Sequence, residues 1–548
     1  MHALLGDLAS QAPAFPINGD NIKVLSSPSE YFEALLEGIT KARYRIVLAS
    51  LYLGTDEMEQ RLADAVGEAA AANPELQVTL LFDALRGTRP TGGKDGTPTS
   101  TADLICKSVL SKAGSWVKAS LYHTPELSGF WKRFLPARYN ETVGIMHLKA
   151  YVFDDTTLMS GANLSTSYFT DRQDRYMLLK DCPALASYLT GLVDTVSHFS
   201  YPLEPDGTLG PPPCGVDPIT DPERFKQTAG NAVRDFVKTA ADVSKEPLTP
   251  PGEHSVSPSK KSLRERLESD WTASGGLLLD RTAADTWVLP TVQMGPLGVR
   301  QDERATLSFF RRLPRHSLVH LASAYFNLAA PYEEALLEAL HESLRVKIVT
   351  AAPTANGFYG SRGPSGLIPG AYSLMEQRLY ERAGGDHQAG LEIFEYSREG
   401  WTFHAKGLWL SLAAEDGRAS ENGRALQNGS VSRTGHMSQN GSVLQHGSVS
   451  QNGSASQNGN VSPKGGSSSA PCLTTIGSPN FGFRSLDKDL ECQLWLLTSH
   501  AELREQLRHE RDRLFEQSAH VSQSTFEAGE RKPTLLVKVA AALSKGHL

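Results

Sequence analysis

The chain has 548 residues, of which 40% are hydrophobic, and a formal net charge of −7. This acidic balance argues against a general nucleic-acid binder, which needs a basic footprint. No apolar stretch approaches the ~20 residues that span a bilayer. The five scattered cysteines include no Cys-x-x-Cys pair, which argues against a disulfide framework or a zinc site.

The first predicted elements form a strand–helix–strand unit. We expect residues 1–20 to be a flexible N-terminal segment. They contain no Lys or Arg and match neither a mitochondrial presequence nor a secretory signal. An apolar run of strand length, Tyr44–Leu53, is followed by a helical pattern over Asp56–Ala72 and a second strand over Gln77–Phe82. This order is typical of a parallel α/β sheet.

A His-x-Lys triplet, His147-Leu-Lys149, comes next. Asp154 follows it, then a Gly161-Ala-Asn163 turn, and then Asp174. Side chains of a strand alternate between its two faces, so His147 and Lys149 are expected to point the same way.

The same series returns in the second part of the chain. An extended segment over Thr286–Val299 and a helical pattern over Asp302–Leu313 open it. The strand, helix and strand then repeat at Ser317–Phe326, Pro331–Leu344 and Arg345–Ala351. The later features repeat as His404, Lys406, Ser478, Asn480 and Glu491. In both copies the asparagine precedes the acidic residue by 11 positions (163 to 174 and 480 to 491), and Ser411 stands where the first copy has Asp154.

This internal repeat predicts a duplicated protein with two α/β halves. We place the first half at 21–202, the second at 286–520 and a tail at 521–548. The Pro- and Gly-rich segment 203–285 is predicted to link them and to enclose one helix near Asp221–Val243. Residues 412–470 are rich in Gly, Ser, Asn and Gln, so we expect a disordered insertion in the second half.

If the halves pack about a pseudo-twofold axis, the two triplets build one pocket at their interface. One neutral imidazole could attack phosphorus while the other, protonated, donates to the leaving oxygen. The two lysines, with the amides of Asn163 and Asn480, would stabilise charge on the phosphoryl oxygens. Asp174 and Glu491 would each hold an imidazole tautomer. The sequence therefore favours phosphodiester chemistry without a metal or another cofactor.

Longer segments around these residues carry a family resemblance. The first triplet with Asp154 resembles the His-x-Lys-x4-Asp signature of the phospholipase D superfamily. The wider sequence resembles the mitochondrial phosphatidylglycerophosphate synthases of eukaryotes. The matching segments are spread over about residues 22–497, among them Ala49–Gly54, Ser160–Ser165, Tyr168–Tyr176, Ala324–Leu328, Trp401–Trp409 and Ile476–Gly482. The resemblance implies two phospholipase D-like α/β sandwich domains with the active site between them.

The resemblance also implies a reaction. The phosphatidyl group of CDP-diacylglycerol would pass through a phosphatidyl-histidine to sn-glycerol 3-phosphate, giving phosphatidylglycerophosphate, the precursor of phosphatidylglycerol and cardiolipin, and CMP. It implies His147 as nucleophile and His404 as general acid and then base. The remaining catalytic residues would be Lys149, Asp154 and Lys406.

Two further contact surfaces are predicted. Arg86 and Arg89, beside a Gly-rich loop that fails the P-loop pattern, are candidates for binding the acceptor's phosphate. Phe130, Trp131 and Phe134, among basic neighbours, are either a contact with an anionic membrane surface or the end of a packed helix. The resemblance implies a peripheral protein on the matrix side of the mitochondrial inner membrane.

Two other functions stay open at this point. A phosphodiesterase of the same fold would use water in place of the alcohol, on a lipid or a nucleic acid. A catalytically dead scaffold is disfavoured by the two intact triplets. Ser411 does not favour it, because the synthase family tolerates loss of that Asp.

Overall fold

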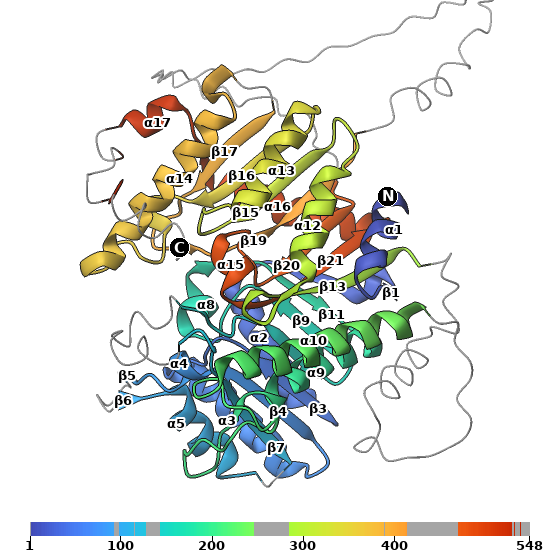
Figure 1. Ribbon diagram of the computed structural model, residues 1–548, viewed down its shortest axis with the longest axis vertical. Helices are drawn as coiled ribbons and strands as arrows, with labels where there is room; N and C mark the ends of the chain where they lie inside the picture. Colours follow the sequence, from blue (N-terminus) through green and yellow to red (C-terminus); the bar gives the residue numbers. More distant parts are fainter. Residues whose placement is uncertain are drawn as a thin grey trace, which may run out of the picture. The chain divides into compact units, whose positions relative to one another are not determined.

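Two large β-sheets organise the protein (Figure 1). The computed structural model describes residues 2–92, 98–113, 116–127, 143–245, 284–387, 390–413, 470–528, 531, 537 and 538. The predicted insertion over 412–470 falls almost entirely outside these residues, so its disorder stays a prediction.

The first half is built on a sheet of eight described strands, in the order β12-β7-β4-β3-β8-β9-β11-β2. Its centre is parallel, with β3 paired to β4 and β4 to β7, and the other pairs are antiparallel. The strands are β2 (Ile22–Leu25), β3 (Arg45–Ala49), β4 (Gln77–Asp83), β7 (Val117–Tyr122), β8 (Ala150–Phe153), β9 (Thr156–Ser160), β11 (Tyr176–Leu179) and β12 (Tyr201–Pro202).

Helices cover both faces of this sheet. Along β3, Ile46 and Leu48 belong to the core formed with α2 (Pro28–Lys41) and α3 (Glu57–Ala72). Val47 and Ala49 belong to the core formed with α9 (Pro183–His198) and α10 (Pro222–Lys245). A strand that is buried on both sides needs an apolar residue at every position, which explains the continuous apolar run.

The second half repeats this arrangement. Its parallel centre is β15, β16 and β17, and antiparallel strands β19, β20, β21 and β13 follow on one side. The strands are β13 (Thr286–Met294), β14 (Val299–Arg300), β15 (Leu318–Ser323), β16 (Arg345–Ala351), β17 (Leu391–Tyr396), β19 (Lys406–Ser411), β20 (Leu473–Gly477), β21 (Leu490–Thr498) and β22 (Ser518–His520). The main helices are α12 (Gln301–Arg311), α13 (Ala330–His341), α14 (Ile368–Arg382) and α16 (Ala501–Glu516). The predicted duplication is therefore confirmed in the fold.

The N-terminal segment is ordered, in contrast to the flexible segment that we predicted for residues 1–20. In α1 (His2–Gln11), Leu4 and Leu8 lie one helical turn apart and enter the core of the second half. β1 (Phe15–Ile17) pairs antiparallel with β13. Figure 1 shows both elements, in blue, beside the strands of the second half. The apolar face of α1, and not its lack of charge, decides its placement.

The predicted linker contains a helix that packs against both halves. α10 covers the stretch predicted at Asp221–Val243. It buries Phe225, Val233 and Phe236, at helical spacing, in a core to which both halves contribute residues. Arg234 of the same helix donates to the Leu297 carbonyl of the second half at 3.1 Å.

One buried arginine ties the halves together. Arg175, just before β11, donates to both carboxylate oxygens of Glu510 in α16, at 3.0 and 2.8 Å, and to the Thr475 carbonyl at 2.6 Å. Its guanidinium carbon lies 3.9 Å from the centre of the Trp409 ring. Because Arg175 is 1% exposed and Glu510 4%, loss of either partner would leave a buried charge without compensation.

Arg175→Met should therefore lower the free energy of unfolding by about 3–5 kcal/mol. Arg508→Met is the matched control, because Arg508 pairs with Glu505 and Asp512 on the exposed side of the same helix. This control substitution should lower the free energy of unfolding by less than about 1 kcal/mol. Denaturant midpoints of the two variants would compare these costs, and equal shifts would contradict a special role for the buried pair.

Candidate active site

Backbone hydrogen bonds between the halves bring the two triplets together. The His147 N–H donates to the Leu490 carbonyl at 2.9 Å, and the His404 N–H donates to the Gln173 carbonyl at 2.8 Å. Each acceptor directly precedes the acidic residue of its own half. The two contacts are therefore equivalent, and each histidine enters the site beside the acid of the opposite half.

Each histidine is held by that acid. His147 Nδ1 lies 2.9 Å from Glu491 Oε2, and His404 Nδ1 lies 2.6 Å from Asp174 Oδ2. None of the four residues is more than 8% exposed. A carboxylate bonded to Nδ1 fixes the tautomer with the proton on Nδ1, and the lone pair then stands on Nε2. Neither half contains a complete histidine–acid pair.

The lysines of the triplets are buried beside the imidazoles. Lys149 Nζ donates to the His147 carbonyl and Lys406 Nζ to the His404 carbonyl, both at 2.9 Å. Lys406 Nζ also lies 3.9 Å from Asp174 Oδ2. Two ammonium groups in one buried cluster suit an anionic substrate that bears phosphate.

Asp154, which we predicted as a catalytic residue, lies at the other end of β8. Its carboxylate accepts hydrogen bonds from the backbone N–H groups of Arg43, Tyr44 and Arg45, at 2.9–3.1 Å. The four residues of β8 separate it from Lys149, and five steps along an extended chain span about 16 Å. The predicted catalytic role of Asp154 stays a prediction that its contacts do not support. These hydrogen bonds give Asp154 a structural role, because they fix the chain before β3. This explains why Ser411, at the end of β19, can replace it in the second half.

The two Gly/Asn turns border the same pocket. Asn163 donates through Nδ2 to the Tyr168 hydroxyl at 3.0 Å. The amide oxygens of Asn163 and Asn480 are buried and have no partner among the described residues. The Ser478 hydroxyl exchanges hydrogen bonds with the main chain of Cys492, so it supports the turn instead of facing a substrate.

The two imidazoles differ at Nε2. The Tyr168 hydroxyl lies 3.3 Å from His404 Nε2, and its ring meets the imidazole edge-on. Ser485 occupies the equivalent position in the second half, and its shorter side chain donates to Glu491 Oε1 at 2.8 Å. No described residue bonds His147 Nε2. The lone pair of His147 is therefore available to a ligand, whereas that of His404 accepts a hydrogen bond.

Burial sets the protonation states of this cluster. It lowers the pKa of His147 and of His404 well below the usual value, and the neighbouring lysines lower both further, so both imidazoles are neutral. Burial also lowers the pKa of Lys149 to about 7 and raises the pKa of Asp174 to about 6. An anionic substrate would raise the pKa of the imidazoles and so allow one of them to act as an acid.

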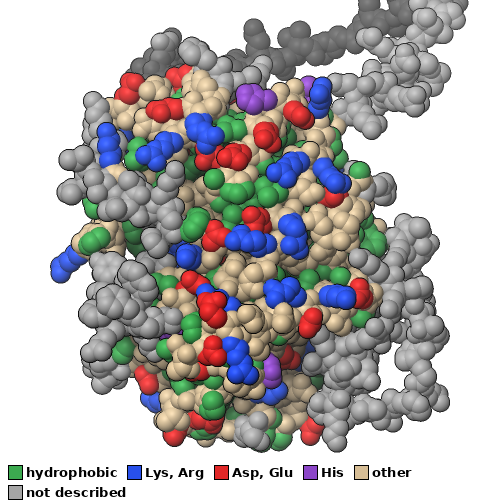
Figure 2. All heavy atoms as spheres, in the orientation of Figure 1, with side chains coloured by type: hydrophobic (Ala, Val, Ile, Leu, Met, Phe, Trp, Pro, Cys, Tyr) green, Lys and Arg blue, Asp and Glu red, His purple; other side chains and the backbone are tan. Residues whose placement is uncertain are grey.

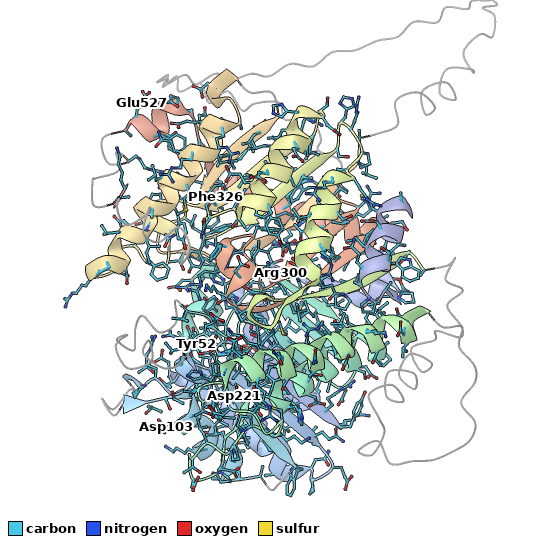
Figure 3. The ribbon with its side chains drawn as sticks, in the orientation of Figure 1. Tyr52, Asp103, Asp221, Arg300, Phe326 and Glu527 are labelled. Carbon is cyan, nitrogen blue, oxygen red and sulfur yellow. The ribbon has the colours of Figure 1, made fainter. Side chains whose placement is uncertain are left out.

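Of the predicted contact residues, only the two arginines are described. Arg86 lies in α4 (Ala84–Gly87), its guanidinium carbon 4.4 Å from the centre of the Tyr52 ring, and Arg89 follows in the next turn. Figure 3 places Tyr52 between α4 and α8 (Thr166–Thr170), the helix that carries Tyr168. The membrane candidates lie outside the described residues and stay predictions: Phe130, Trp131 and Phe134.

Sequence reasoning missed several residues around His404 and His147. The Tyr325 ring meets the His404 imidazole at 5.7 Å between centroids, and Arg172 lies over the Tyr168 ring. The sequence did contain a signal for Arg172. The equal spacing from asparagine to acid in the two halves aligns Arg172 with Asp489, which has the opposite charge. Comparison of equivalent positions would have shown where the two halves differ in charge.

Relatives with curated names extend over nearly the whole chain, although no family model matches it. The mitochondrial CDP-diacylglycerol–glycerol-3-phosphate 3-phosphatidyltransferase of Gallus gallus is 37% identical over 541 residues, which cover 97% of this chain and 84% of that protein. The human protein of the same name is 35% identical over the same shares. A probable transferase of this name from Dictyostelium discoideum is 32% identical and covers 100% of this chain and 81% of its own length.

The fold is also found in a solved structure. Phosphatidylserine synthase of Haemophilus influenzae superposes with a TM-score of 0.64 at 19% identity, over 100% of this chain and 99% of that one. The predicted phospholipase D-like α/β fold is therefore confirmed. In the described part of the chain, no helix has the length and apolar character needed to cross a membrane. With relatives above 30% identity along most of their length, the chain belongs to the CDP-diacylglycerol–glycerol-3-phosphate 3-phosphatidyltransferase family.

Proposed function

We propose that the protein transfers the phosphatidyl group of CDP-diacylglycerol to sn-glycerol 3-phosphate, releasing CMP and phosphatidylglycerophosphate. The crossed pairs His147–Glu491 and Asp174–His404 are the observation that carries this proposal. They supply two oriented, neutral imidazoles to one buried site. The names of the relatives describe the same reaction.

The reaction proceeds in two displacements at phosphorus. The lone pair on an imidazole Nε2 attacks the phosphorus next to diacylglycerol, and the bond from that phosphorus to the CMP oxygen breaks. The second imidazole takes up a proton at Nε2 when the anionic substrate binds, gives this proton to the departing CMP, and later takes the proton of the glycerol 3-phosphate hydroxyl. That hydroxyl oxygen attacks phosphorus, and the phosphorus–nitrogen bond breaks. Lys149 and Lys406 stabilise the charge on the phosphoryl oxygens.

The asymmetry at Nε2 supports one assignment of roles. His147, whose lone pair has no partner among the described residues, is the nucleophile. His404, with Tyr168 at hydrogen-bond distance, is the general acid and then base. The Tyr168 hydroxyl would have to leave His404 Nε2 before an alcohol could bind there. A nucleophile gains nothing from such a partner, because the hydrogen bond occupies its lone pair.

Incubation with CDP-diacylglycerol and labelled glycerol 3-phosphate, without added metal, tests the proposal. Phosphatidylglycerophosphate and CMP in equal amounts are the expected products. Phosphatidic acid alone would indicate the alternative phosphodiesterase, and no product at all a scaffold. On the face drawn in Figure 2, acidic and basic side chains are interspersed, which does not favour a nucleic-acid substrate.

The pKa values of Lys149 and Asp174 predict the pH dependence of the first displacement. We expect kcat/KM for CDP-diacylglycerol, measured as exchange of labelled CMP, to be highest between about pH 6 and pH 7. Below this window Asp174 gains a proton and no longer accepts the His404 Nδ1–H. Above it Lys149 loses its charge.

Lys149→Arg separates the two limbs of this profile. Arginine keeps its charge at every accessible pH, so the alkaline decline should move to higher pH while the acidic decline stays near pH 6. An unchanged alkaline limb would show that another group causes it.

The relatives are named mitochondrial, which supports a mitochondrial location, and we propose the matrix side of the inner membrane with peripheral attachment. Aromatic side chains at the headgroup level and basic neighbours would provide that attachment. Trp131→Asp with Phe134→Asp should weaken binding to vesicles of anionic phospholipid about tenfold or more. Tyr44→Asp is the control, because this exposed ring stands next to the Asp154 end of the sheet. Equal binding of the double variant and the parent would remove these residues from the membrane contact.

A further inference from the structure

Arg172 is a cation beside the catalytic pair, and the described residues give it no acidic partner. Its Nε donates to the Thr402 hydroxyl at 3.0 Å, and its guanidinium carbon lies 4.6 Å from the centre of the Tyr168 ring. No described carboxylate lies within ion-pair distance of it, although it is half-buried. Several half-buried or buried arginines of the described chain pair with carboxylates, namely Arg45, Arg175, Arg300, Arg484 and Arg511. Half-buried Arg504 instead donates to the carbonyls of Ala470 and Pro471. A half-buried guanidinium without an acidic partner, beside a catalytic cluster, indicates an anionic ligand.

The equivalent position in the other half carries the opposite charge. Asp489 stands two residues before Glu491, as Arg172 stands two residues before Asp174. Asp489 is already satisfied, because it accepts from Arg484 and from the Ile145 N–H, both at 3.1 Å. The Arg172 side of the site therefore attracts a further anion, and the Asp489 side does not.

The position of Arg172 relative to His404 suggests which anion it binds. The Tyr168 ring contacts both the Arg172 guanidinium and the His404 imidazole, so the guanidinium stands about one ring width from the proposed general base. In glycerol 3-phosphate the reacting hydroxyl and the phosphate are separated by three carbons. A residue that binds that phosphate must accordingly stand several ångströms from the base, whereas CMP has its leaving oxygen directly on phosphorus.

Tyr325 of the second half adds a hydroxyl group close to the Arg172 guanidinium. A Cβ on Gly357 would lie 3.3 Å from the Tyr325 hydroxyl and 3.4 Å from Arg172 Nη2, so the two polar groups lie close to the same small residue. Tyr325 also meets the His404 imidazole edge-on. A guanidinium fork with a neighbouring hydroxyl provides the donors that a phosphomonoester accepts.

We propose that Arg172, assisted by Tyr325, binds the phosphate of the acceptor and makes the enzyme specific for a phosphorylated alcohol. This inference rests on the proposed transfer reaction and goes beyond it, because it assigns the acceptor to the His404 side. Arg172 thus takes the place of Arg86 and Arg89 as the proposed contact for the acceptor's phosphate.

Three assays on the full chain test the proposal: transfer to glycerol 3-phosphate, transfer to neutral glycerol, and exchange of labelled CMP into CDP-diacylglycerol. Arg172→Gln should lower kcat/KM for glycerol 3-phosphate about 100-fold, mainly through KM. Transfer to glycerol and CMP exchange should stay within about twofold of the parent, because neither needs the acceptor's phosphate. For Arg172→Lys, kcat/KM for glycerol 3-phosphate should lie between the values of the parent and of Arg172→Gln, because lysine keeps the charge but lacks the two-pronged guanidinium.

Arg61→Gln is the matched control. Arg61 also lies over an aromatic ring, 5.1 Å from the centre of Phe32, but it is exposed on α3. It should leave all three assays unchanged. If Arg172→Gln lowers exchange and glycerol transfer as much as transfer to glycerol 3-phosphate, Arg172 only positions His404 or binds CMP, and the proposal is overturned. An unchanged KM in an otherwise active variant overturns it too, whereas a parent without transfer activity overturns the proposed function itself.

Discussion

His147→Ala should abolish phosphatidyl transfer and CMP exchange together, with a loss of about 10⁴-fold or more. The proposed nucleophile is then missing, and no covalent intermediate can form. His404→Ala should lower transfer by about 10²–10⁴-fold, because it removes general acid–base catalysis and leaves the nucleophile in place. The double variant should be little worse than His147→Ala alone, since the two residues act as a unit.

The intermediate separates the two histidines more sharply than the rates do. With CDP-diacylglycerol labelled in its phosphatidyl group, His404→Ala should still accumulate labelled protein after an alkaline quench, and His147→Ala should not. Label on His147→Ala but not on His404→Ala would reverse the assignment of nucleophile and acid. His509→Ala is the control, because His509 opens a third His-x-basic triplet, His509-Glu-Arg511, and is exposed on α16. It should behave like the parent in both assays.

Much of the fold could be predicted because the duplication repeats local patterns. The helix expected over Asp56–Ala72 is observed as Glu57–Ala72, and the strand expected over Gln77–Phe82 as Gln77–Asp83. The strand expected over Arg345–Ala351 is found with these bounds. In each case an apolar period within one segment determines the element, and no distant contact is needed.

The features that could not be predicted depend on contacts between residues far apart in the chain. β1 joins the sheet of the second half through a partner some 270 positions away, and nothing in Phe15–Ile17 specifies which half it enters. Arg175 was visible only as the residue after Asp174, until the fold placed Glu510 against it. The backbone contacts of Asp154 could not be predicted either, because a family signature records which residue recurs and not which atoms it contacts.

The candidate site shows the same division. The triplets and their acids could be found from equal spacing, but spacing cannot say whether an acid serves the histidine of its own half. The backbone contacts of His147 with Leu490 and of His404 with Gln173 decide this, and they exist only once two halves have folded against each other. Differences between equivalent positions, such as Tyr168 and Ser485, then give each histidine its own environment.

The crossed pairing predicts which step each acid supports, and pairing of each acid with the histidine of its own half would reverse the two assignments. Glu491→Gln should reproduce the defect of His147→Ala and slow formation of the phosphatidyl-enzyme by about 10²–10⁴-fold, because Glu491 holds the His147 tautomer. Asp174→Asn should instead resemble His404→Ala, with labelled intermediate that is consumed slowly by glycerol 3-phosphate. Asp171→Asn, at an exposed acid three residues earlier, should leave both steps unchanged.

Rapid-quench measurement of the two steps in each variant provides the decision, with thermal midpoints to show that the variants remain folded. If Glu491→Gln slowed only the second step and Asp174→Asn only the first, the acids would act within their own halves. If the expected pattern is observed, each displacement uses a histidine from one half and a carboxylate from the other. The phosphatidyl-enzyme would then form only where both halves meet. A single half contains a complete His-x-Lys triplet and an acid, but its one imidazole would not be oriented for attack.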